Sequence, residues 1–174
     1  MTVIRYLTAF GPASVMDAQA WCGLTRLGEV VDRLRPKLRV FRDEGGRELF
    51  DPQRAPRPDP DVPAPVRFLP VYDNVLLGHA DRTRVLPDAS RASLFGGDPI
   101  GNVGSVLVDG LVRATWRLDR GADRATIQVE PLARLFKEDR ASIEAEGVDL
   151  LELLAPDAAR RDVRIVARAR RSGG

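Results

Sequence analysis

The sequence is poor in the residues that build disulfides, metal sites and membrane spans. Its 174 residues include one cysteine and one histidine. An intramolecular disulfide is therefore impossible, and a zinc site made from several thiolates or imidazoles is excluded. No apolar run approaches the length of about 18 residues that a transmembrane helix needs. The N-terminus also lacks a basic segment followed by an apolar run, so we expect no signal peptide, no metal or other cofactor, no membrane contact and a cytoplasmic location.

Lysine is also scarce. Only Lys37 and Lys137 stand among 27 basic side chains, which nearly balance 25 acidic ones and leave a formal net charge of +2. Arginine binds phosphate well through its guanidinium group, so the high arginine content can indicate phosphate binding. A high arginine content can also follow from codon usage, and the composition leaves both explanations open. With 44% hydrophobic residues, the chain can bury a core as one domain or two small ones.

Three short helices are predicted near the N-terminus. Apolar spacing predicts the first over residues 4–10. Ser14, with Asp17 three residues later, predicts the start of a second helix over residues 15–22, which Gly23 ends. Thr25 is expected to cap a third helix, which Pro36 stops and whose apolar face is formed by Leu27, Val30, Val31 and Leu34.

A hairpin and a proline-rich segment follow the helices. Residues 37–42 alternate, residues 43–46 are typical of a turn, and residues 48–50 can return as a second strand. Three helices followed by a hairpin predict a winged helix-turn-helix over residues 1–51. Residues 52–65 contain six prolines and are interpreted as an extended linker between two packing units.

The second half, residues 66–170, is predicted to be a β-rich, barrel-like domain with one long helix. Strands are expected at residues 66–69, 75–78, 83–86, 105–108, 111–118, 125–129 and about 163–167. Asp109-Gly110 is a strong hairpin signal. Apolar spacing predicts the helix from about 132 to 154. The fold class predicted for the whole chain is therefore α+β.

A cluster of basic side chains is the strongest candidate binding surface. It runs from the third helix into the hairpin, with no acid from residue 33 to 42, and its members are Arg26, Arg33, Arg35, Lys37, Arg39 and Arg42. On a winged helix these cations would face the DNA backbone and bind by releasing counterions. The alternative is a solvated basic edge strand that prevents pairing between sheets. The third helix has few side chains suited to base recognition, so we expect little sequence preference.

No catalytic constellation emerges from the residues themselves. His79, beside Asp81 and Arg82, is interpreted as a structural histidine at a strand end. No serine lies in a Gly-x-Ser-x-Gly segment, which gives a hydrolase triad no support.

Three segments resemble the winged-helix crosslink-repair DNA glycosylase family. The first covers residues 6–14 with Asp17, Trp21 and Gly23-Leu24. The second runs from Leu69 through Asp73, Asn74 and His79 to Arg82, and the third covers residues 108–110 and 115–117. The resemblance implies tandem winged helices around a basic, concave DNA surface and a barrel-like C-terminal part. It also marks Asp73, Asn74, His79 and Arg82 as a possible signature site.

In that family the catalytic pair lies in a Gln-x-Gln or Gln-x-Asp motif near the N-terminus, and Asp17-Ala18-Gln19 is not that motif. We therefore transfer no catalytic residue and leave enzymatic activity open. The resemblance implies DNA repair, with duplex DNA as the partner and an upstream N-terminal region as a second one. Two alternatives stay open: an active glycosylase completed by that upstream region, and a protein-interaction domain that has lost DNA binding.

Overall fold

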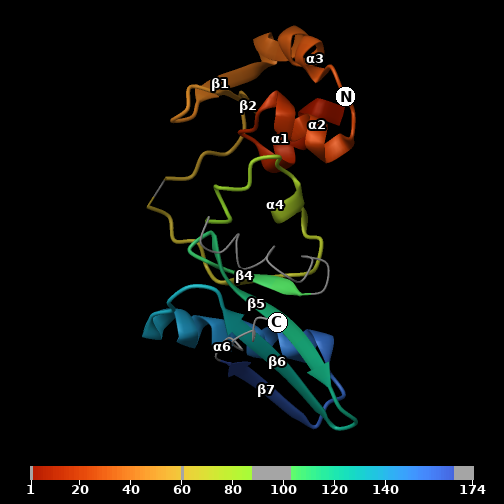
Figure 1. The fold of residues 1–174 in the computed structure, drawn as a ribbon, viewed down its shortest axis with the longest axis vertical. Coiled ribbons are helices and arrows are strands. Elements are labelled where there is room, and N and C mark those ends of the chain that lie inside the picture. The colour runs from red at the N-terminus through yellow and green to blue at the C-terminus, as the bar shows by residue number, and fades with distance from the viewer. Residues whose placement is uncertain (1, 60, 88–102, 167–174) are drawn as a thin grey trace, which may run out of the picture. The chain divides into compact units, whose positions relative to one another are not determined.

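The computed structural model describes residues 2–59, 61–87 and 103–166. The chain divides into two compact units. Unit 1 comprises Met1–Val62 and Asn74–Arg82, and unit 2 comprises Pro63–Asp73 and Thr83–Gly174. Helices and strands occur in both units, so the predicted α+β class is confirmed (Figure 1).

Unit 1 begins with three helices at the predicted positions: α1 (Thr2–Phe10), α2 (Val15–Cys22) and α3 (Leu27–Leu34). Ser14 caps α2 as expected, and Gly23 ends it in the left-handed conformation, with φ of 69°. The start of α3 differs from the prediction. Arg26, with φ of 60°, precedes the helix without a side-chain cap, and Thr25 does not cap it. The Gln19 side chain instead accepts the Leu27 amide at 3.0 Å.

A short 3₁₀ turn, η1 (Arg35–Lys37), leads from α3 into an antiparallel hairpin. The hairpin consists of β1 (Leu38–Arg42) and β2 (Glu48–Pro52), with Val40 opposite Phe50. Ala13, between the first two helices, forms a β-bridge to Phe50 on the other side of β2. The hairpin is thereby attached to the helices, and the shared core consists of Val3, Tyr6, Leu7, Ala13, Ala18, Leu27, Val31, Leu38 and Phe50.

The segment Asn74–Arg82 departs most from the sequence-based expectation. Residues 75–78 were predicted as a strand but form the short helix α4 (Asn74–Leu77), and residues 83–86 form turns instead of a strand. The segment packs in unit 1 although the predicted boundary assigned it to residues 66–170. The physical reason is a set of contacts with α1, because Tyr6 donates its hydroxyl to the Gly78 carbonyl at 2.7 Å and Phe10 lies against Gly78.

Unit 2 is built on a five-stranded sheet in the order β3-β4-β5-β6-β7. The strands are β3 (Arg67–Leu69), β4 (Gly104–Val108), β5 (Leu111–Arg120), β6 (Arg124–Pro131) and β7 (Arg160–Ile165). All neighbours are antiparallel except β6 and β7, which are parallel. The described strands form an open sheet, not the expected barrel, because β3 and β7 are its edges and do not pair with each other.

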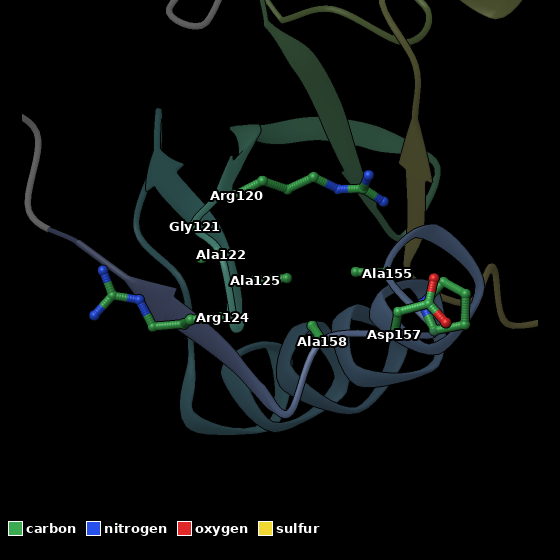
Figure 2. Close-up of a pocket in the computed structure, with 9 residues that line it drawn as sticks. Arg120, Gly121, Ala122, Arg124, Ala125, Ala155, Asp157 and Ala158 are labelled. Carbon is green, nitrogen blue, oxygen red and sulfur yellow. The ribbon is translucent and has the colours of Figure 1, made fainter.

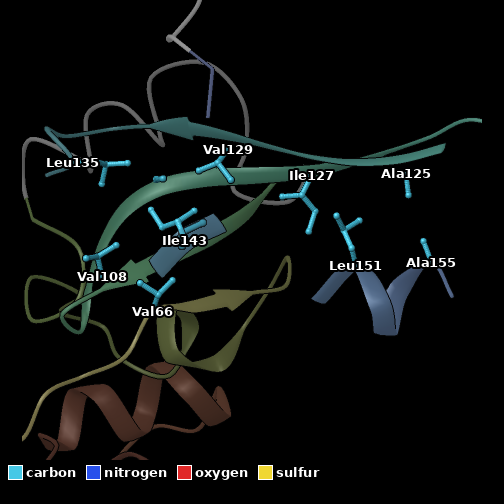
Figure 3. Packing of buried hydrophobic residues seen from close by; sticks show 11 residues of the cluster. Val66, Val108, Ala125, Ile127, Val129, Leu135, Ile143, Leu151 and Ala155 are labelled. Carbon is cyan, nitrogen blue, oxygen red and sulfur yellow. The ribbon is translucent and has the colours of Figure 1, made fainter. Parts of the chain in front are cut away.

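The long helix α6 (Lys137–Leu154) supplies the second half of the unit 2 core. It begins later than the predicted residue 132. Ile143 and Leu151 point from α6 toward Ile127 and Val129 of β6, as Figure 3 shows. Gly147 of α6 lies close to Val163 of β7, and only glycine fits there, because a Cβ at residue 147 would lie 2.9 Å from Cγ2 of Val163. None of the helices in the described part of the chain is long and apolar enough to cross a bilayer.

Candidate nucleic-acid interface

The six predicted DNA-contacting cations all lie on unit 1 and all are exposed. Arg26 and Arg33 belong to the start and the last turn of α3, Arg35 and Lys37 to η1, and Arg39 and Arg42 to β1. The structure therefore gathers them on consecutive elements. Two of the six, however, are already paired with an acid.

Glu48, on β2, neutralises the paired cations. Its carboxylate accepts hydrogen bonds from Arg35 at 2.6 Å and from Arg42 at 3.2 Å, and Arg35 also pairs with Asp32 at 3.1 Å. The hydrogen bond from Arg35 lowers the pKa of Glu48, and the hydrogen bond to Glu48 raises the pKa of Arg35. Exposed ion pairs of this kind contribute little to stability, so both arginines can exchange Glu48 for another anion at small cost.

The remaining cations, Arg26, Arg33, Lys37 and Arg39, form no ion pair within the described residues. The guanidinium of Arg39 stacks on Phe41, with its carbon 5.2 Å from the ring centroid. The exposed side of α3 also carries two acids, Glu29 and Asp32. The positive electrostatic field of this surface therefore comes more from the cations of η1 and β1 than from α3.

Arg57, five residues after β2, packs against the same hairpin, a placement that the sequence analysis did not predict. Its guanidinium carbon lies 5.8 Å from the Phe41 ring centroid, and it pairs with the buried Asp51 at 3.0 Å. It also donates to the carbonyls of Pro52, Gln53 and Ala55. The first residues of the predicted linker are thus attached to the hairpin.

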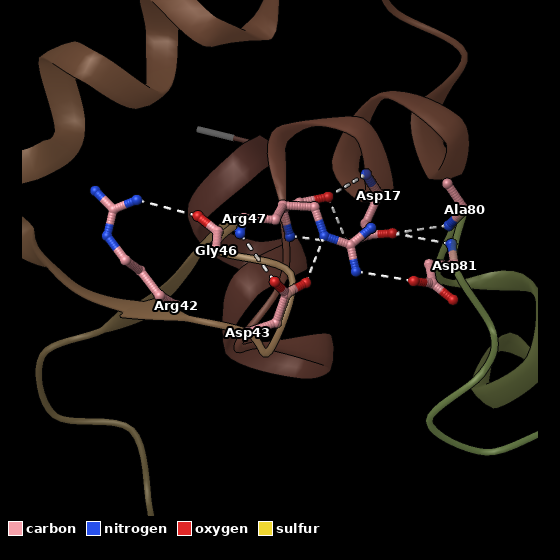
Figure 4. A network of polar contacts seen from close by, with 8 residues as sticks. Asp17, Arg42, Asp43, Gly46, Arg47, Ala80 and Asp81 are labelled. Carbon is pink, nitrogen blue, oxygen red and sulfur yellow. Dashed lines mark hydrogen bonds and ion pairs between the residues drawn. The ribbon is translucent and has the colours of Figure 1, made fainter.

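A buried carboxylate, Asp17, connects α2 to the segment after α4 (Figure 4). The side chain is 2% exposed. One oxygen accepts the Ser14 amide at 2.8 Å and hydroxyl at 2.6 Å, and the other accepts the amides of Ala80 at 2.9 Å and Asp81 at 3.2 Å. Burial by itself raises the pKa of Asp17, but the hydrogen bonds from Ser14 and Asp81 and the nearby His79 outweigh it and lower the pKa.

The tip of the β1–β2 hairpin is held by a second polar contact to the same segment. Arg47 pairs with Asp43 across the turn and with Asp81, both at 2.8 Å (Figure 4). The backbone and side-chain hydrogen bonds from Arg47 lower the pKa of Asp43. The hairpin is therefore anchored at the middle of β2 by Ala13 and at its tip by Asp81.

The four signature residues lie in α4 and in the segments on either side of it. Asn74 begins α4, and Asp73 and Arg82 are half-buried. Nε2 of His79 lies 3.0 Å from the Phe10 carbonyl oxygen, a contact that requires a proton on Nε2, and the His79 ring packs against Tyr6 and Phe10. These contacts fit the structural role expected for His79, which stays a prediction.

Each unit has a surface pocket among its described residues. In unit 2, a pocket of about 170 Å³ lies between the β5–β6 turn and the end of α6. Figure 2 shows Arg120 reaching across this pocket and Arg124 pointing away, above a floor of Ala125, Ala155 and Ala158. In unit 1, an apolar groove is lined mainly by Val3, Ile4, Leu24, Leu27, Val30 and Leu34. No group of three or more metal-ligating side chains occurs in the described ranges.

Comparisons with known proteins first define the class of fold. The chain is similar in structure to the Streptomyces sahachiroi DNA glycosylase AlkZ, with a TM-score of 0.71 and 22% sequence identity. The match covers 94% of this chain and 44% of that chain, so this chain spans less than half the length of that relative. None of the curated proteins matches.

The family follows from the sequence model that matches most of the chain. The model is described as DNA glycosylase AlkZ-like, and it matches residues 2–153. The protein belongs to the AlkZ-like DNA glycosylase family. The resemblance drawn from residues 6–14, 69–82, 108–110 and 115–117 is thereby confirmed.

Proposed function

We propose that unit 1 is a winged-helix module that binds duplex DNA by its phosphate backbone, within a DNA glycosylase. The family assignment and the exposed, unpaired cations on η1 and β1 support this proposal. Three helices followed by a hairpin support the winged-helix interpretation, as does the single-residue β-bridge by which Ala13, between α1 and α2, pairs with β2.

The expected strength of binding follows from the number of unpaired cations. Each phosphate contact contributes a slope of about −0.9 to the dependence of log affinity on log salt concentration. Engagement of Arg26, Arg33, Lys37 and Arg39 therefore gives a slope of roughly −3 to −4. Sequence preference is slight, because the exposed side of α3 combines Arg33 with two acids and offers few paired donors to bases.

The experiment is a salt titration of the chain on a labelled duplex, followed by fluorescence anisotropy. Arg33→Ala combined with Lys37→Ala flattens the slope by about two units. The matched control combines Arg5→Ala with Arg54→Ala, which removes the same charge from exposed positions of unit 1 outside the cluster. Equal flattening in both double variants, or the absence of binding at low salt, contradicts the proposal and favours a protein-interaction role.

We also propose that this part of the chain holds DNA without completing base excision. Excision needs an activated group beside a flipped base. Among the described residues, the two buried carboxylates are Asp17 and Asp51, and Asp51 pairs with Arg57. Both oxygens of Asp17 are occupied by the amides and hydroxyl of Ser14, Ala80 and Asp81, which leaves this carboxylate little capacity to hold a water. Incubation with alkylated or crosslinked duplex, followed by detection of abasic sites, should give no signal above the protein-free control, and a signal contradicts this second proposal.

A further inference from the structure

An exposed tyrosine occupies a strained position in the turn after β3. Residues 70–73 leave the strand at Leu69, and Tyr72 has φ of 59°. The Tyr72 side chain is 64% exposed, and that of the preceding Val71 is 41% exposed. This turn belongs to unit 2 and lies outside the basic cluster of unit 1.

Stability does not account for a tyrosine at this position. Positive φ at the third residue of a β-turn favours Gly or Asn, and it is uncommon for large side chains. Exposure of most of the ring to water also removes the gain from burial. When a residue is both strained and exposed, an interaction with a ligand is a reasonable explanation for it.

The turn is held firmly where it leaves the sheet. Trp116 of β5 donates its indole N–H to the Leu69 carbonyl at 2.8 Å, and Leu69 lies opposite Ser105 of β4. The Trp116 ring packs edge-on against Phe68, with centroids 5.6 Å apart. The Tyr72 ring is therefore presented from a rigid base, which lowers the entropy cost of using it for binding.

The size of the exposed surface indicates the kind of partner. Stable protein–protein interfaces bury about 800 Å² on each side, far more than one tyrosine and one valine offer. One flat ring matches the face of a single nucleobase, and aromatic side chains stack on bases whatever their sequence. We propose that Tyr72 stacks on a nucleobase at a step where the DNA duplex has been opened. This inference rests on the proposed DNA binding.

A stacking ring has a use in base-excision repair. Removal of a base from the helix leaves a gap, and an inserted side chain can occupy an unstacked step. Loss of one base–aromatic stack weakens binding by about 5- to 150-fold. Because stacking neutralises no phosphate, its loss leaves the salt dependence unchanged.

The test compares two short labelled duplexes, one fully paired and one with a single abasic analogue beside 2-aminopurine. Wild-type protein binds the abasic duplex more tightly and quenches 2-aminopurine fluorescence. Tyr72→Asn and Tyr72→Gly, which suit positive φ, lose that preference and the quenching. Tyr72→Phe keeps both, because it keeps the ring. Val71→Ala, the matched control in the same turn, also keeps both.

The outcomes separate the stacking inference from the proposed function. If the wild type binds neither duplex, DNA binding and stacking both fail. If the wild type binds and Tyr72→Asn retains the preference for the abasic duplex, stacking alone is overturned. A Tm of Tyr72→Asn at or above that of the wild type, with the preference lost and the salt slope unchanged, supports stacking. A lower Tm together with weaker binding to both duplexes assigns the residue to folding and overturns it.

Discussion

Asp17 should be among the most stabilising polar side chains of unit 1, because it accepts four hydrogen bonds while buried. Asp17→Ala removes the carboxylate half of the α2 capping box, worth about 1 kcal/mol, and leaves the partly buried amides of Ala80 and Asp81 without their carboxylate acceptor, at about 1–2 kcal/mol each. We expect a total loss of about 3–5 kcal/mol of unfolding free energy. Asp17→Asn keeps one acceptor oxygen and should lose about 2–3 kcal/mol.

The assay is urea unfolding monitored by Trp21, which packs against Tyr6 and Phe10 in unit 1. Trp116→Phe in the reference protein and in both Asp17 variants removes the second tryptophan signal. Asp139→Ala is the matched control, because Asp139 occupies the same position near the start of α6 and accepts the Phe136 amide at 2.8 Å. Asp139 accepts no hydrogen bond from a distant segment of the described chain, so Asp139→Ala should lose only about 1 kcal/mol of unfolding free energy, measured with Trp116 retained. A loss below about 1 kcal/mol for Asp17→Ala would refute the reasoning.

The pH dependence gives an independent check on Asp17. Its pKa in the folded protein is lower than the ordinary value of 3.8, so the unfolded chain takes up the proton first as the pH falls. The stabilisation is therefore fully present above the ordinary pKa and is lost as the pH passes below the folded pKa. The stability difference between wild type and Asp17→Asn should be constant near about pH 6 and shrink toward about pH 2. A difference that grows in acid would contradict the lowered pKa.

Four further predictions follow from single contacts. Glu48→Gln frees Arg42 and loosens Arg35, so DNA affinity should rise and the salt slope should steepen by about one unit; weaker binding would count against the interface. Gly147→Ala should destabilise unit 2 by about 1–3 kcal/mol, and Val163→Ala should relieve part of that loss, whereas strictly additive losses would exclude the steric explanation. Arg57→Ala should speed tryptic cleavage after Arg54, and an unchanged rate would mean that Arg57 does not hold residues 52–57. His79→Ala should lower Tm and alter DNA binding only in proportion to the fraction unfolded; a folded variant that fails to bind would assign His79 to the interface.

Local patterns in the sequence predicted most elements of the fold. Apolar spacing located α1, α2 and α3, and Asp109-Gly110 located the β4–β5 turn, because helix periodicity, caps and tight turns depend on residues close in sequence. The family resemblance also came from continuous segments. Residues 75–78 were assigned wrongly, since Val75, Leu76 and Leu77 form an apolar run too short to distinguish a strand from a turn of helix.

The tertiary structure decided which charges are available and which segments belong together. The sequence shows Arg35 and Arg42 as free cations, and only the hairpin register brings Glu48 beside both of them. The Ser14–Asp17 spacing identifies a helix cap, but the second oxygen of Asp17 finds Ala80 and Asp81 more than 60 residues away. Arg57 is similar, because its contact with Asp51 depends on how a proline-rich segment turns back. Such pairings depend on the path of the chain in space, whereas helices and turns depend on neighbours in sequence, and so the sequence alone predicted the elements and not the polar contacts that join them.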